Sequence, residues 1–103
     1  MVSYNNIWIG LVHVSSLPNN DLLGNAKGAY VNVLALANNP NDFTNKVKES
    51  IIDLGLDFIE LEDAELFSER IENYEVQENI KILATEVIKS KEVRFGDFHT
   101  YDD

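Results

Sequence analysis

The sequence predicts an α/β domain of the α+β type, a two-layer sandwich in which two helices cover one face of a mixed sheet of four or five strands. Apolar runs rich in β-branched residues alternate with two segments of helical periodicity, which is the pattern of this class. With 45% hydrophobic residues, the composition is that of globular proteins. A chain of 103 residues has room for one core, so residues 1–103 are expected to form a single domain.

The N-terminal part is expected to hold two neighbouring strands. Residues 7–14 are apolar in both alternating phases, which favours a strand covered on both faces. Residues 15–28 are dense in Gly, Pro, Asn and Asp and predict a long loop. Residues 29–37 are again apolar in both phases and predict the second strand, paired with the first.

The clearest element is a helix over residues 40–54. Asn39 can cap it, Pro40 suits its first position, and Gly55 suits the left-handed residue that ends a helix. Apolar residues recur along it at helical spacing, namely Phe43, Val47, Ile51 and Leu54. Residues 56–62 then predict a strand, which makes a β-α-β unit with the second strand.

The C-terminal half leaves one segment open. Residues 63–75 fit either a short helix or a return strand, residues 74–90 predict a second helix, and residues 92–101 predict a last strand. The order is therefore β-β-α-β-(α or β)-α-β, and a strand at residues 65–70 would give the ferredoxin-like order after the first strand. Both helices are expected to pack on the same sheet face, burying Phe43, Val47, Ile51, Ile80, Leu83 and Val87 against Val31, Val33 and Ile59.

Charge and composition exclude several classes of protein. A formal net charge of -10 argues against nucleic acid and anionic membranes as partners, because both are bound by Lys and Arg. The absence of cysteine excludes thiolate chemistry and disulfides, and favours the cytoplasm. The start of the chain has neither the pattern of a signal peptide nor an apolar run long enough to span a membrane.

The acidic window from Asp57 to Glu78 is the most unusual feature of the sequence. It contains nine of the 18 carboxylates, opposed only by Arg70. Such a run is most typical of a solvated face that keeps the protein soluble. The second interpretation is a docking face that steers a cationic protein. A hard cation is a third possibility, although the window lacks the Asp/Asn and Gly pattern of a calcium loop.

The C-terminal strand adds an aromatic edge. Phe95 and Phe98 can pack on helix ends. Alternatively, these two residues and Tyr101 can anchor an interface, since aromatic residues are common anchors there. The candidate partner-binding residues are therefore Glu60, Glu62, Asp63, Glu65, Glu69, Glu72, Phe98 and Tyr101.

No catalytic, cofactor-binding or metal-binding residue is assigned. His13, Asp97 and His99 could together form a two-histidine, one-carboxylate site, but a histidine in an apolar strand is more typically a hydrogen-bonded structural residue. The serines lie outside any nucleophile elbow, and the glycines are too scattered for a phosphate-binding loop.

These observations favour a non-enzymatic, cytoplasmic binding protein that covers a basic partner such as a nuclease toxin, as bacterial immunity proteins and antitoxins do. The alternative is a small ligand-binding or catalytic α/β domain that acts as a homodimer. A pocket lined by His13, Asp97 and His99 would support that alternative.

Overall fold

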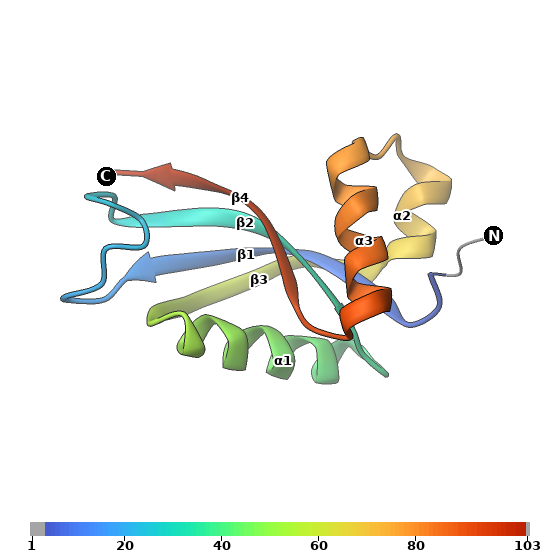
Figure 1. Cartoon of the computed structure of the whole chain (residues 1–103), viewed down its shortest axis with the longest axis horizontal. Coiled ribbons are helices and arrows are strands. Elements are labelled where there is room, and N and C mark those ends of the chain that lie inside the picture. The colour runs from blue at the N-terminus through green and yellow to red at the C-terminus, as the bar shows by residue number, and fades with distance from the viewer. Residues whose placement is uncertain (1–3, 103) are drawn as a thin grey trace.

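The computed structural model describes residues 4–102, which form a four-stranded sheet and three helices (Figure 1). The elements are β1 (Ile7–Ser16), β2 (Gly28–Leu36), α1 (Pro40–Asp53), β3 (Leu56–Leu66), α2 (Phe67–Asn73), α3 (Glu78–Ser90) and β4 (Arg94–Tyr101). The α+β class and the compact architecture agree with the sequence. No helix within residues 4–102 has both the length and the apolar character needed to cross a membrane.

The sheet is antiparallel throughout, so the expectation of a mixed sheet was wrong. Its strand order is β3-β1-β2-β4, and each neighbouring pair runs antiparallel. The β-α-β unit does form, because β2 and β3 run in the same direction. These two strands are not neighbours, however, since β1 lies between them and pairs with both. Long-range pairing of the first strand thus decides the sheet type.

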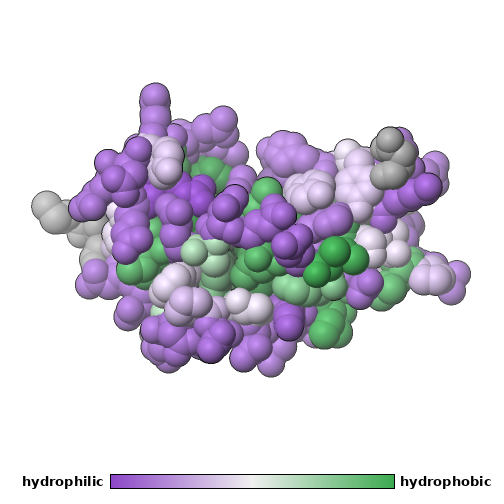
Figure 2. All heavy atoms as spheres, turned by 180° about the vertical axis from the view of Figure 1, so that it is seen from behind, coloured by the Kyte–Doolittle hydropathy of each residue, from purple (hydrophilic) through white to green (hydrophobic). Residues whose placement is uncertain are grey.

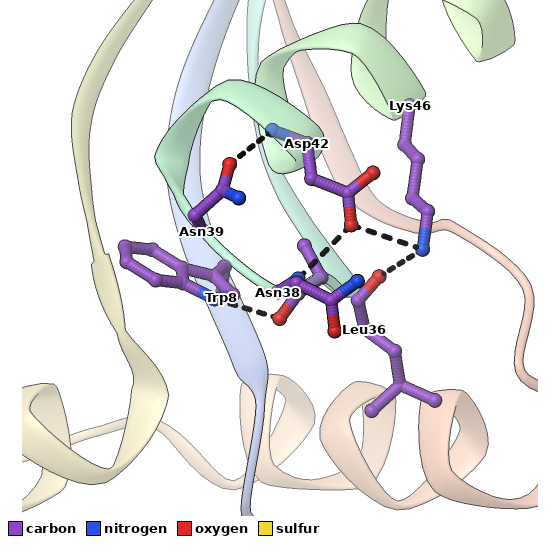
Figure 3. Close-up of polar contacts among 7 residues, drawn as sticks. Trp8, Leu36, Asn38, Asn39, Asp42 and Lys46 are labelled. Atoms are coloured by element: carbon purple, nitrogen blue, oxygen red, sulfur yellow. Dashed lines mark hydrogen bonds and ion pairs between the residues drawn. The ribbon is translucent and has the colours of Figure 1, made fainter.

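Helix α1 begins where the sequence predicts, and side chains fix its start against the end of β2 (Figure 3). Asn39 Oδ1 accepts a hydrogen bond from the Asp42 backbone N–H at 2.8 Å, which satisfies one free donor of the first turn. Lys46 Nζ donates to the Leu36 carbonyl at 2.7 Å, and Trp8 Nε1 donates to the Ala37 carbonyl at 3.1 Å. The helix entry is therefore held by both the preceding strand and β1.

The segment that the sequence left open continues as strand and then as helix. Strand β3 runs on to Leu66, and α2 begins at Phe67, whose side chain is fully buried. A fifth strand does not form here, and the β-α-β-β-α-β order of the ferredoxin-like fold is therefore absent. Burial of Phe67 against β1 residues Ile7 and Ile9 favours the helical alternative.

The helices lie on opposite faces of the sheet, which corrects the expected two-layer arrangement. The α1 side chains Phe43, Val47 and Ile51 pack in one cluster with Val12 and Val31. The side chains of α2 and α3 pack in a second cluster, which contains Ile7, Ile9, Leu34, Phe67, Ile80, Ala84 and Val87. Figure 1 shows α1 beneath the sheet and the α2–α3 pair at its right-hand end.

The helices lie on opposite faces because the apolar residues of the strands point alternately to both faces of the sheet. Val12 and Val31 face α1, whereas Ile9 and Leu34 face α2 and α3. A strand that is apolar in both phases needs cover on both sides, and the two helical units supply it. Two expected core residues lie outside the buried core. Leu83 is half-buried at the edge of the second cluster, and Ile59 is exposed at the register shift between Phe58 and Glu60.

Candidate binding face

Helices α2 and α3 cover only one end of their sheet face. Ile7 and Ile9 are buried beneath them, but farther along β1 the side chains of Leu11 and His13 are only half-buried. On β2, Tyr30 is 37% exposed. We call this uncovered part the open face; it is formed by Leu11, His13, Tyr30, Asn32, Glu60, Glu62, His99 and Tyr101.

Strand register brings these residues together from all four strands. His13 lies opposite Glu60 of β3 and Tyr30 of β2, and Tyr30 in turn lies opposite His99 of β4. Directly opposed residues point to the same face of a sheet. A polar and aromatic row therefore crosses all four strands, and it consists of Glu60, His13, Tyr30 and His99. A parallel row contains Glu62, Leu11 and Asn32.

Three rings form a packed cluster at the centre of the open face. The His13 ring stacks on Tyr30 with 4.4 Å between centroids and 13° between planes. His13 Nε2 is hydrogen-bonded to the Tyr101 hydroxyl at 2.6 Å. Gly28 leaves the space for this, because a Cβ on Gly28 would lie 2.6 Å from Tyr101 Cζ. Stacking, the hydrogen bond and close packing together hold the three rings in one arrangement.

The acidic edge of the open face is strand β3, and no strand within residues 4–102 pairs with its outer side. Glu60 is exposed and Glu62 is half-buried, and both belong to the open face. The register shifts between Glu62 and Glu65, where Asp63 takes a positive φ of 54°. Carboxylates and an irregular backbone both protect a sheet edge from pairing with another chain.

A groove of about 650 Å³ separates the open face from the overhanging α2–α3 turn. In Figure 2 it corresponds to the notch in the upper outline between the helices and the strands. Its walls include Asp63, Glu65, Arg70 and the turn residues Tyr74–Gln77, and Asn32 and His99 connect it to the open face. Arg70 Nε donates to Glu65 Oε1 at 2.9 Å.

The structure distributes the sequence-predicted site residues over four places. Glu60, Glu62 and Tyr101 belong to the open face, and Asp63 and Glu65 line the groove. Glu69 and Glu72 are exposed on α2. Phe98 does not join the others: it packs beside the α1 cluster, because it and Tyr101 are three residues apart on one strand and point to opposite faces.

Sequence reasoning missed Tyr30, Asn32, Tyr74 and Gln77 as members of this site. The alternation of polar residues with buried ones was visible in β2, where Tyr30 and Asn32 interrupt an apolar run. Their proximity to Glu60 could not be predicted from the sequence, because it depends on which strands pair.

The two histidines share a face, but β2 separates their strands. Across residues 4–102, no group of three His, Cys, Asp or Glu side chains is placed to hold a metal ion. The groove includes His99 but neither His13 nor Asp97, so the pocket considered from the sequence does not assemble. The open face and the groove present carboxylates, amides and aromatic rings, which can form ion pairs, hydrogen bonds and stacking contacts.

In comparisons with known proteins, no family model, no curated protein and no solved structure matches the chain.

Proposed function

We propose that this chain is a small acidic binding protein that covers a basic protein partner, in the manner of bacterial immunity proteins and antitoxins. The observation that supports this most is the open face itself, where Glu60 and Glu62 border a cluster of three rings on the part of the sheet face that α2 and α3 leave uncovered. Carboxylates beside aromatic rings suit Arg and Lys side chains, which pair with the former and stack on the latter.

The charge of the whole molecule favours the same class of partner. A formal charge of -10 on a domain 43 × 25 × 22 Å in extent creates a negative potential that attracts cationic proteins from a distance. Nuclease toxins bind phosphates with cationic surfaces, so an acidic cover competes for the same surface. We place this interaction in the cytoplasm, in keeping with the absence of cysteine.

The test compares two variants of equal charge change. Glu60→Lys with Glu62→Lys reverses the acidic edge of the open face, whereas Glu49→Lys with Asp53→Lys reverses two exposed carboxylates on α1, on the far side of the sheet. Glu65 is left unchanged because its ion pair with Arg70 is half-buried.

The partner used in this test is a basic protein. It is either the product of a neighbouring gene or a protein that the wild-type chain captures. We expect the open-face variant to slow association by about tenfold or more at low salt, and the α1 variant to have a much smaller effect. Association rates from surface plasmon resonance measure this. Equal effects of both variants would show that net charge alone acts and that the open face is not the contact.

The groove favours a second candidate, a small ligand-binding or catalytic domain. As a separate part of this proposal, the domain acts as a homodimer. A volume of about 650 Å³ lies within the range of roughly 300–1,000 Å³ that is usual for small-molecule sites. A small metabolite that raises the unfolding temperature of the free protein, together with a dimeric mass in solution, would support this candidate over the first.

A further inference from the structure

We infer that the groove beneath the α2–α3 turn receives an arginine side chain of the partner and so anchors it beside the open face. This inference rests on the proposed function, because it names the chemical group by which a basic partner would be recognised. The groove adjoins the open face through Asn32 and His99, so a chain lying across the sheet could place one side chain in it.

The charge of the groove calls for a cation. Its lining contains three carboxylates, Asp63, Glu65 and Glu75, and one cationic side chain, Arg70, which leaves a formal charge of -2. Within residues 4–102, Arg70 pairs with Glu65, while its Nη2 donates to the Asp63 backbone carbonyl at 3.4 Å and leaves the Asp63 carboxylate free of that contact. The carboxylates of Asp63 and Glu75 therefore remain as acceptors for an incoming group.

The residues that line the groove favour arginine over lysine. Tyr74 is 64% exposed and stands on the wall, where its ring can receive a planar guanidinium. The guanidinium has five donors, enough to bond two carboxylates and the Gln77 or Asn32 amide oxygen together. The chain's own Arg70, bonded to Glu65 in the same wall, shows that this wall already binds one guanidinium.

A second groove on the molecule has a different charge and position, and it serves as the comparison for the first. It measures about 520 Å³ and lies beside α1, lined by Glu49, Asp53 and Glu92 together with Lys46 and Lys91. Lysine charges oppose its carboxylates, and it lies away from the open face. It should bind cations less well.

The probe is an N-acetylated, C-amidated Gly-Arg-Gly peptide, titrated into the ¹⁵N-labelled whole chain and followed by NMR. Peptides with lysine or with neutral citrulline in place of arginine are the comparisons. We expect saturable shifts at Asp63, Tyr74–Gln77 and His99 with arginine, weaker ones with lysine and none with citrulline.

The decisive variant is Asp63→Asn with Glu75→Gln. Asn tolerates the positive φ of Asp63, so the fold is kept while both charges are lost. Affinity for the arginine peptide should fall about threefold or more, while Glu49→Gln with Glu92→Gln, an equal charge change in the second groove, should leave it unaltered. Tyr74→Ala should also weaken binding, and Tyr74→Phe should restore it.

Shifts confined to Glu60 and Glu62 would overturn the groove inference and leave the proposed acidic face intact. An equal response to arginine and citrulline would overturn it as well. Binding of a basic protein that is insensitive to Glu60→Lys with Glu62→Lys, while the groove still binds the arginine peptide, would instead contradict the proposed function and retain the groove.

Discussion

At the residue scale, the aromatic cluster depends on a glycine in the neighbouring strand. Tyr101 lies opposite Gly28 in the β2–β4 register, and its ring passes over Gly28 to reach His13. The sequence places Gly28 at the end of a loop, where a turn would explain it equally well. Only the pairing of β2 with β4 shows that the missing side chain makes space for a ring.

Gly28→Ala should therefore destabilise the protein and displace Tyr101. The added Cβ would lie 2.6 Å from both Tyr101 Cζ and the Val14 carbonyl oxygen, and such overpacking typically costs about 1–3 kcal/mol. Urea denaturation measures the loss, and the ¹⁵N shifts of His13 should report the broken hydrogen bond. The matched control is Gly96→Ala, whose Cβ would meet its nearest neighbours at an ordinary 3.6 Å. Equal stabilities of the two variants would contradict the packing described for Gly28.

At the scale of elements, α2 is a helix whose formation depends on tertiary packing. It has seven residues and no side-chain hydrogen bond at its N-cap, so its local sequence supports a helix weakly. Phe67 at its first position is fully buried, and its ring meets that of Tyr4 edge-on at 5.0 Å. The helix forms because it places the Phe67 side chain in the second core cluster, where the ring is buried.

Phe67→Ala should cost about 3–5 kcal/mol, the range of large aromatic truncations in cores. Thermal and urea unfolding measure the loss. Ile82→Ala on α3 removes an apolar side chain that is 52% exposed, and it should cost less than about 1 kcal/mol. A small effect of Phe67→Ala would mean that residues 67–73 do not pack on the sheet as described.

At the scale of the whole molecule, self-repulsion accompanies the acidic surface. At about 0.01 M salt the Debye length of roughly 30 Å is comparable to the molecule's extents of 43 × 25 × 22 Å, so most of its carboxylates repel one another. At about 0.15 M the range falls to roughly 8 Å. Charge that would steer a basic partner thus lowers the stability of the free domain.

Added sodium chloride should accordingly raise the unfolding temperature, 1 kcal/mol corresponding to roughly 4–8 °C in a domain of this size. Scanning calorimetry between about 0.01 and 0.15 M salt measures the change. The variant with Glu60→Lys and Glu62→Lys has a formal charge of -6 instead of -10, and its dependence on salt should be smaller. A wild-type unfolding temperature that falls with salt would show that favourable ion pairs outweigh the repulsion.

Features that depend on residues close in the chain can be predicted from the sequence. The Asn39 cap, Pro40 and Gly55 specify α1 to within a residue, because caps and left-handed ends act within one turn. Apolar residues in both alternating phases indicate β1 and β2 as strands that are covered on both faces. The acidic window is visible in the composition, and the cost of burying charge explains why none of its carboxylates is fully buried.

Tertiary structure alone decided which element covers which face. Periodicity identifies the apolar stripe of α3, but the same stripe could pack on either side of a sheet that is apolar on both. The row from Glu60 through His13 and Tyr30 to His99 joins residues far apart in the chain, and it exists only because β1 pairs with both β2 and β3. Pairing between distant strands is selected by the packing of the whole core, which no local pattern encodes.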